Sequence, residues 1–301
     1  MYERIISKAE ELGISAKRDE PLKEYTSFKI GGPADLLIQP DSTESLSEIL
    51  KTCKAEGVTP YILGRGSNVL VSDDGVRGVV IVMGEAFSKI EYCGNNLLKV
   101  QAGASLRRVC LFCLDYSLSG MEFAYGIPGS TGGGVYMNAG AFGGELSDRI
   151  VLVDHMDMNG NKGSFQGSRE LDFSYRHSRY MDEDLIITSV IFYLEKGNPD
   201  AIKMKMDNIL GRRKAKQPLE YPSAGSTFKR PEGNYASKLI DECGLRGKEI
   251  GGAQVSEKHT GFIVNKGDAT AEDVKALVKY VQDTVERKTG ILLEPEIRFF
   301  P

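Results

Sequence analysis

The sequence lacks tryptophan and has only three histidines, His155, His177 and His259, so the first 154 residues contain none. Histidines this far apart do not have the spacing of zinc ligands, and we predict no metal site. Two of the five cysteines, Cys110 and Cys113, form a CxxC, but no second pair follows. They lie in a stretch with helical periodicity. We therefore predict that they are buried apolar residues rather than redox or metal ligands.

Long apolar runs and an excess of positive charge are also absent. No run approaches the roughly 20 residues of a membrane-spanning helix, and the N-terminal MYERIISKAEELG lacks the apolar block of a secretory leader. The formal net charge is −4, whereas surfaces that bind duplex nucleic acid usually carry a basic excess. We expect a cytoplasmic protein that neither inserts into a membrane nor binds nucleic acid.

One local basic cluster stands out against this balance. It consists of Arg212, Arg213, Lys214 and Lys216. Positive charge at the end of a predicted helix interacts favourably with the helix dipole, and we favour this interpretation. Contact with a phosphate group is the alternative.

A chain of 301 residues is longer than a typical domain with a single hydrophobic core. Its pattern of helices and strands predicts an α/β (α+β) fold with three lobes. Apolar periodicity and capping residues predict helices, and short β-branched runs predict strands. The helices are expected at about 42–53, 105–117, 200–215, 234–243 and 270–289. The strands are expected near 59–75, 79–83, 90–102, 150–157, 185–195, 260–265 and 291–300. The lobes are expected at 1–84 joined by the C-terminal strand 291–301, at 85–196 and at 197–290.

Two glycine-rich segments have the composition of ligand-binding loops. GRGSN covers residues 64–68, and GIPGSTGGGVYMNAGAFGGE, residues 126–145, contains eight glycines in twenty positions. Backbone N–H groups in such turns form concavities that suit a diphosphate. Tight turns between strands are the alternative explanation. Neither segment fits the GxGxxG dinucleotide fingerprint or the GxxxxGK[ST] phosphate loop.

Together these two segments resemble the FAD-binding domain of the vanillyl-alcohol-oxidase-type flavoproteins. The resemblance implies a two-subdomain FAD-binding region followed by a substrate domain, with FAD bound non-covalently. A histidyl link from the first lobe is impossible, because that lobe has no histidine. We expect Gly66 and Gly132 to lie where the backbone approaches the diphosphate. The implied cofactor-binding residues are Gly64, Arg65, Gly66, Ser67, Asn68, Gly129, Ser130, Thr131, Gly132, Gly133, Asn138 and Ala141.

Four further motifs narrow the resemblance to one reductase family. TSFKIGGPAD, FSYRHSRY, AGSTFKRP and LEPEIRFF occur in the family's order over roughly residues 25–300. The set is similar to the UDP-N-acetylenolpyruvoylglucosamine reductases, in their shorter form without an aromatic lid segment. The resemblance implies that NADPH reduces FAD, which then reduces UDP-N-acetylglucosamine enolpyruvate to UDP-N-acetylmuramate for peptidoglycan synthesis.

The family motifs also imply the residues that perform the chemistry. Arg176 follows SY and would bind the substrate carboxylate, with Arg179 as the competing candidate. Ser226 would donate a proton to the α-carbon, although an isolated serine here would be a turn hydroxyl. Glu296 would assist charge stabilisation, on a strand face shared with Glu294 and Arg298.

Lys216, which precedes the serine loop, matches a family position that contacts the substrate. Two rival functions use the same features. One is a different oxidoreductase on the same FAD-binding fold, and the other is a non-catalytic protein that binds a nucleotide sugar.

Overall fold

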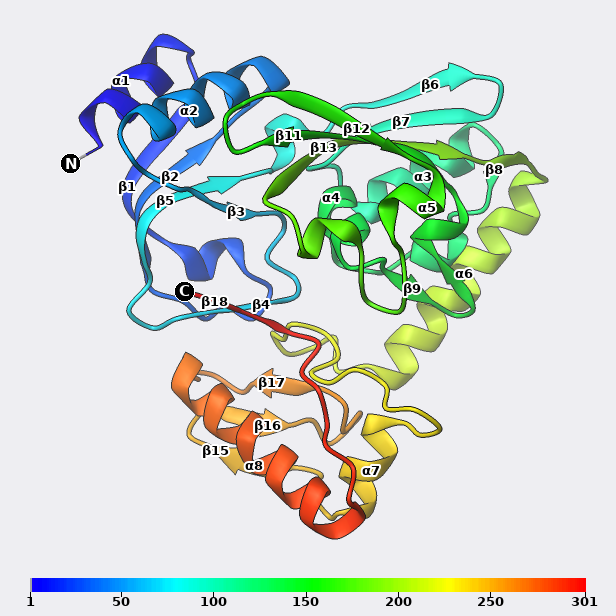
Figure 1. Cartoon of the computed structure of the whole chain (residues 1–301). Helices are drawn as coiled ribbons and strands as arrows, with labels where there is room; N and C mark the ends of the chain where they lie inside the picture. The colour runs from blue at the N-terminus through cyan, green and yellow to red at the C-terminus, as the bar shows by residue number, and fades with distance from the viewer. Residues whose placement is uncertain (1) are drawn as a thin grey trace. The chain divides into compact units, whose positions relative to one another are not determined.

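The computed structural model describes residues 2–301 and divides into two compact units, each assembled from separate stretches of chain (Figure 1). Unit 1 consists of the residues up to Arg18, Asp35–Arg65 and Gly78–Arg212. Unit 2 consists of Asp19–Ala34, Gly66–Arg77 and Arg213–Pro301. Each unit has a hydrophobic core of its own.

The first sheet of unit 1 has four strands in the order β1-β2-β5-β3. Its strands and the two neighbouring helices are α1 (Glu3–Glu11), β1 (Ser15–Pro21), β2 (Pro33–Gln39), α2 (Thr43–Ala55), β3 (Tyr61–Leu63) and β5 (Val76–Val82). Ser42 caps α2 in a capping box with Ser45, and the helix buries the predicted apolar face that includes Leu46, Leu50 and Cys53. α1 and α2 lie side by side (Figure 1).

The second sheet of unit 1 has five antiparallel strands in the order β12-β11-β13-β7-β6. These are β6 (Ile90–Gly94), β7 (Leu97–Gln101), β11 (Ile150–Asp157), β12 (Lys162–Gln166) and β13 (Leu185–Tyr193). The predicted hairpin around Gly94 is present, and Asn95 and Asn96 adopt φ of 48° and 64° in its turn. The sequence analysis missed β12, because its residues are mostly exposed.

Shorter elements and helices complete unit 1. They are η2 (Glu85–Phe87), α3 (Leu106–Asp115), β8 (Leu118–Ser119), η3 (Glu122–Ala124), α4 (Thr131–Tyr136), β9 (Gly140–Ala141), β10 (Gly144–Glu145), η4 (Leu146–Asp148), α5 (Gly167–Leu171), η5 (Arg179–Met181), β14 (Glu195–Lys196) and α6 (Pro199–Lys216). Cys110 and Cys113 lie on α3 and are each 1% exposed, as predicted for core cysteines. Burial raises the pKa of Cys113 to about 12, so it stays an unreactive thiol at neutral pH.

Unit 2 contains a three-stranded antiparallel sheet, two helices and a separate strand pair. The elements are η1 (Leu22–Tyr25), β4 (Val69–Val71), α7 (Ala236–Glu242), β15 (Glu249–Ile250), β16 (Ala253–Val255), β17 (Ile263–Asn265), α8 (Ala271–Thr289) and β18 (Arg298–Phe300). α8 begins at a capping box of Thr270 and Asp273 and ends at Gly290, whose φ is 73°. β18 pairs in parallel with β4.

The α/β fold class is confirmed, while the grouping of the chain differs from the expected lobes. The four-, five- and three-stranded sheets follow one another in chain order. However, the first two sheets belong to one compact unit, and β4 lies in unit 2 with the C-terminal strand. The three-domain boundaries therefore stay a prediction.

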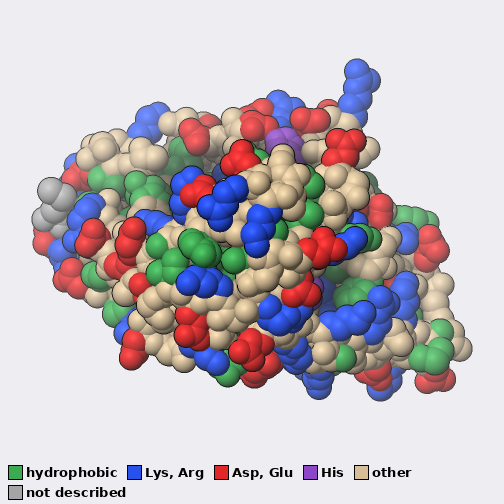
Figure 2. All heavy atoms as spheres, turned by 90° about the horizontal axis from the view of Figure 1, so that it is seen from below, with side chains coloured by type: hydrophobic (Ala, Val, Ile, Leu, Met, Phe, Trp, Pro, Cys, Tyr) green, Lys and Arg blue, Asp and Glu red, His purple; other side chains and the backbone are tan. Residues whose placement is uncertain are grey.

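The surface charges and the hydropathy of the helices agree with what the composition predicts. Acidic and basic side chains are interspersed over the face shown in Figure 2, as a formal net charge of −4 leads one to expect. Among residues 2–301, no helix is long and apolar enough to cross a bilayer.

The core of unit 1 includes a buried histidine. His155 is 8% exposed, and its Nδ1 lies 3.1 Å from the Tyr180 hydroxyl. Its ring packs against Phe165, with the ring centroids 4.5 Å apart. Burial, with a smaller contribution from Arg179, lowers the pKa of His155, although the carboxylates of Glu183 and Asp154 oppose this. The ring is therefore neutral in the folded protein at neutral pH.

We predict that the free energy of unfolding decreases as the pH falls from about 7 to about 5. The unfolded chain binds a proton at His155 near the ordinary histidine pKa, whereas the folded chain resists it, so acid favours unfolding. His259, whose pKa burial also lowers, contributes in the same direction. In urea titrations across this range, His155→Phe should reduce the slope of stability against pH. Equal slopes for the parent and the variant would contradict this interpretation.

Candidate active site

The two glycine-rich segments meet inside unit 1. A Cβ added to Gly64, directly after β3, would lie 2.6 Å from Oγ of Ser130. Ser130 is the N-cap of α4 and accepts a hydrogen bond from the Gly133 N–H at 3.3 Å. Any side chain at position 64 would therefore displace the cap of α4.

The backbone donors of the second segment fall into two groups. The N–H groups of Thr131 and Gly132 donate to carbonyl oxygens of Ala104 and Ala102, each at 2.8 Å. The Thr131 hydroxyl also donates to the Ala104 oxygen, at 2.9 Å. In contrast, the N–H groups of Gly129 and Ser130 donate to no acceptor among residues 2–301. Unpaired donors in a glycine turn fit an anionic group such as a diphosphate.

Glycine at positions 66 and 132 has a reason in the packing of the chain itself. Gly66 has φ of 58°, and a Cβ there would collide with the Tyr25 carbonyl oxygen. A Cβ at Gly132 would lie 2.9 Å from that of Ala102. The protein's own packing requires glycine at both positions. A side chain at either position would disturb the fold, and the expected approach of this backbone to the diphosphate stays a prediction.

The first segment is divided between the units. Gly64 and Arg65 belong to unit 1, where Arg65 lies 3.8 Å from the carboxylate of Glu85. Gly66, Ser67 and Asn68 belong to unit 2.

Arg176 lies in a tight four-residue turn. Ser174 and His177 exchange two backbone hydrogen bonds of 3.2 Å, and Arg176 between them has φ of 56°. A left-handed backbone is uncommon for a residue other than glycine and is a feature of functional sites. The guanidinium donates to the Gly140 carbonyl oxygen at 3.1 Å and lies 5.0 Å from the Tyr175 ring centroid.

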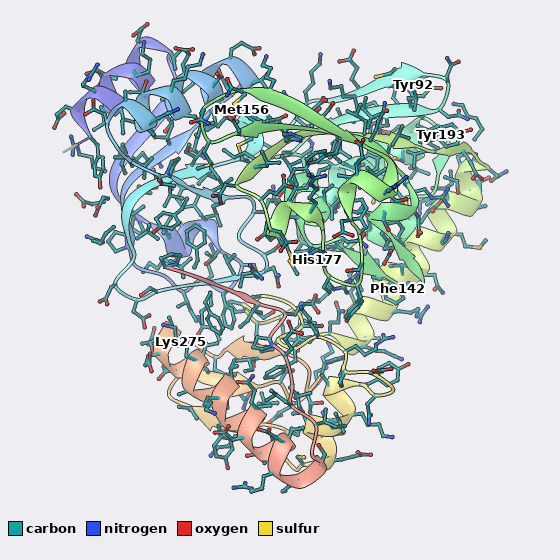
Figure 3. The ribbon with its side chains drawn as sticks, viewed as in Figure 1. Tyr92, Phe142, Met156, His177, Tyr193 and Lys275 are labelled. Atoms are coloured by element: carbon teal, nitrogen blue, oxygen red, sulfur yellow. The ribbon has the colours of Figure 1, made fainter. Side chains whose placement is uncertain are left out.

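Figure 3 labels His177 on the Arg176 turn and Phe142 at the tip of the β9–β10 hairpin that contains Gly140. The His177 Nε2 lies 2.9 Å from the Asp182 carboxylate, which anchors the far side of the turn.

Arg179, the competing candidate, is engaged by structural partners. Its Nε lies 2.5 Å from the Glu183 carboxylate and its Nη1 donates to the Glu170 carbonyl oxygen. Its guanidinium also lies 4.2 Å from the Phe165 ring centroid. These contacts give Arg179 a role in holding α5 and η5, and they favour Arg176 as the ligand-binding arginine.

Asn138 and Ala141 occupy different environments. Ala141 lies on the half-buried strand β9. Asn138 is fully buried, and its amide binds the backbone at Ser174 and Ser147, each at 3.1 Å. This arrangement engages both ends of the Asn138 amide with the protein itself, and the expected contact of Asn138 with the cofactor stays a prediction.

In unit 2, hydrogen bonds connect the serine loop to the C-terminal segment. The N–H of Glu296 donates to the Thr227 carbonyl oxygen at 2.8 Å, and Phe228 forms an antiparallel bridge with Pro295. The Ser226 hydroxyl, directly before Thr227, makes no hydrogen bond with the described residues. It is therefore available to a ligand.

Only Arg298–Phe300 of the strand expected at 291–300 form a strand, and Phe299, expected on the face of Ile297, is 50% exposed. Glu296 precedes this strand. It is half-buried, while its neighbour Ile297 is 3% exposed on the opposite face. The Asn68 amide donates to the Glu296 carbonyl oxygen at 3.1 Å, and the Arg298 N–H donates to the Asn68 carbonyl oxygen at 2.9 Å. Asn68, Glu296 and the Ser226 loop thus lie together in unit 2.

Unit 2 contains two further residues with side chains suited to a ligand, Lys216 and His259. Lys216 is exposed at the end of α6. His259, which the sequence analysis did not select, lies in the turn whose Gly261 carbonyl accepts the Thr227 N–H at 2.8 Å. The Gly261 N–H donates to Nδ1 of His259, so the neutral ring carries its proton on Nε2. A lone histidine gave no signal in the sequence, because the pairing of these loops is long-range.

The last feature of the site concerns metal ligands. Residues 2–301 contain no group of three or more His, Cys, Asp or Glu side chains arranged to hold a metal ion.

Comparison with known proteins matches two separate parts of the chain to known families. Residues 34–162 match the FAD binding domain family, and residues 217–300 match the C-terminal domain of UDP-N-acetylenolpyruvoylglucosamine reductase. The reductase of Clostridium novyi is 47% identical over 279 residues, which cover 92% of this chain and 89% of that protein. The reductase of Caldanaerobacter subterraneus is 46% identical over 300 residues, 99% of this chain and 98% of that protein.

A solved structure agrees with this result. The UDP-N-acetylenolpyruvylglucosamine reductase of Thermus caldophilus superposes with a TM-score of 0.81 at 36% sequence identity, over 96% of this chain and 99% of that one. The chain therefore belongs to the UDP-N-acetylenolpyruvoylglucosamine reductase family of FAD-containing oxidoreductases.

Proposed function

We propose that this chain uses NADPH to reduce UDP-N-acetylglucosamine enolpyruvate to UDP-N-acetylmuramate, with Arg176, Ser226 and Glu296 as its catalytic residues. The observation that carries the assignment of residues is in unit 2. An unbonded Ser226 hydroxyl lies on a loop whose next residue is hydrogen-bonded to Glu296. The full-length similarity to reductases of this name supports the reaction itself.

The cofactor requirement fits the residues present. The unpaired N–H groups of Gly129 and Ser130 suit the diphosphate of FAD. Bound FAD would supply the hydride chemistry between NADPH and the substrate double bond. The protein has to bind the substrate carboxylate, stabilise the charge that moves onto it, and deliver a proton to the α-carbon.

Arg176 is the residue that binds the carboxylate. Its planar guanidinium can donate two parallel hydrogen bonds to a carboxylate, which lysine cannot do. One Nη already donates to the Gly140 carbonyl oxygen, and this fixes the plane of the guanidinium. As the β-carbon gains a hydride, the π electrons move toward the carboxylate. A fixed cation there stabilises the resulting enediolate-like charge.

Ser226 gives the proton to the α-carbon, and Glu296 assists in controlling the charge. The serine hydroxyl has no hydrogen-bond partner among the described residues, so it can be directed at a substrate. Lys216 would contact the substrate, since it lies on the segment that leads to the serine loop. We also infer a cytoplasmic location, because NADPH and nucleotide-activated sugars are cytoplasmic metabolites.

Arg176→Lys should lower kcat/KM by about 10- to 100-fold, the loss expected for one charge-assisted hydrogen bond. Lysine keeps the positive charge but cannot donate two parallel hydrogen bonds to the carboxylate. Arg176→Ala should lower it further. The measurement is steady-state NADPH oxidation that depends on the enolpyruvyl UDP-sugar. Arg179→Ala is the matched control and should reduce thermal stability more than turnover. An active Arg176→Ala enzyme together with an inactive Arg179→Ala enzyme would show that the wrong arginine was chosen.

Ser226→Ala should separate the two half-reactions. Reduction of the flavin by NADPH needs no proton at the substrate α-carbon and should be nearly unchanged. Reoxidation by the enolpyruvyl sugar should slow by about 10²- to 10⁴-fold, the contribution of a positioned proton donor. Ser226→Cys, with a more acidic group of similar reach, should recover part of the rate.

Rapid mixing of each half-reaction makes this measurement. Equal slowing of both halves in Ser226→Ala would indicate a structural role of the hydroxyl. No slowing in either half would mean that the proton comes from another group.

A further inference from the structure

The Arg176 turn has a backbone conformation that needs support from its surroundings. A non-glycine residue at φ of 56° is strained, and such strain persists only where neighbouring contacts fix it. Within the turn itself, the Ser174–His177 pair of 3.2 Å hydrogen bonds holds the chain. These are long for backbone hydrogen bonds, so the turn needs further anchors.

Asn138 supplies one of these anchors from the glycine-rich segment. Its side chain is fully buried, and its Nδ2 donates to the Ser174 carbonyl oxygen at 3.1 Å. Its Oδ1 accepts the Ser147 N–H at 3.1 Å. A backbone N–H can only donate and a carbonyl can only accept, so these partners fix the orientation of the amide.

The same short stretch of chain also holds the guanidinium of Arg176. Gly140, two residues after Asn138, accepts the Arg176 Nη2 hydrogen bond at 3.1 Å. Between them, the Ala139 carbonyl accepts the Leu146 N–H at 3.1 Å, which closes the base of the β9–β10 hairpin. Residues 138–140 therefore contact the turn at its backbone and at its functional side chain.

We propose that Asn138 is a positioning residue for Arg176, which it serves by fixing the Ser174–His177 turn rather than by contacting the cofactor. The inference rests on the carboxylate-binding role proposed above for Arg176. Loss of the Asn138 donor releases the turn from the base of the hairpin. The guanidinium then no longer points along a single direction, and a misplacement of about 1 Å can cost on the order of 10² in rate.

Asn138→Asp is the informative variant, because it has the same shape and still accepts the Ser147 N–H. It cannot donate to the Ser174 carbonyl oxygen when ionised, so two acceptors then face each other. Asn198→Asp is the matched control. Asn198 is exposed at the start of α6, and its Oδ1 accepts the Ala201 N–H at 3.0 Å, a role that aspartate also fills.

We expect full flavin content and an unchanged rate of flavin reduction by NADPH in Asn138→Asp. Reoxidation by the enolpyruvyl UDP-sugar should slow by about 10- to 100-fold, while the control behaves as the parent. In an Arg176→Ala background, Asn138→Asp should cause almost no further slowing, because the residue that it positions is absent. Full additivity in this double variant would overturn the proposal, as would parent-like reoxidation in the single variant. Flavin loss with slowed NADPH reduction would also overturn it and would indicate a cofactor contact.

Hydrogen–deuterium exchange tests the positioning separately from the reaction. Peptides covering residues 172–178 should exchange faster in Asn138→Asp than in the parent, with α2 unchanged. If Arg176→Ala reoxidised at the parent rate, the catalytic assignment would fail, and this exchange would decide the structural claim alone. Equal exchange in both proteins would refute it. If Asn138→Asp did not fold, Asn138→Ser, which is too short to bridge both partners, would be measured with the same outcomes.

Discussion

The left-handed backbone of Arg176 is the constraint on which this account of the site depends. Holding a residue other than glycine at φ of 56° costs on the order of 1–3 kcal/mol, which other contacts must offset. Asn138, Gly140 and the His177–Asp182 pair supply such contacts from three directions. In return, the arginine has little freedom to rotate, so less entropy is lost when it binds a carboxylate.

The serine loop of unit 2 follows a different principle. Thr227 is 1% exposed, and its N–H, carbonyl and hydroxyl are bonded to Gly261, Glu296 and Ile263 respectively. The neighbouring Ser226 makes no side-chain hydrogen bond with the described residues, and its hydroxyl is left for a ligand. The hydrogen bonds of Thr227 fix the backbone next to Ser226. The Ser226 hydroxyl is thereby positioned while its own hydrogen-bonding capacity stays available to a ligand.

The sequence predicted several elements that depend on local pattern, although it missed α1 and the mostly buried β2. α2 and α8 follow from apolar periodicity and capping residues, and Cys110 and Cys113 follow from the apolar face of α3. β1 and β12 escaped prediction because most of their side chains are exposed, so no apolar alternation marks them. The candidates Arg176, Ser226 and Glu296 came from family motifs, whereas the hydrogen bond from Asn138 to Ser174 joins segments 36 residues apart and leaves no local signal. At Gly66, the packing against Tyr25 requires glycine whether or not a ligand lies nearby, and the sequence alone does not reveal this contact.

This chain passes electrons from NADPH through its flavin to an enolpyruvyl UDP-sugar. The most direct measurement mixes the anaerobically reduced parent protein with that sugar and follows the flavin absorbance. The account predicts rapid reoxidation without oxygen, with one lactyl-ether sugar formed per flavin. Reduced flavin that stays reduced with the sugar, and is reoxidised only when oxygen is admitted, would contradict it.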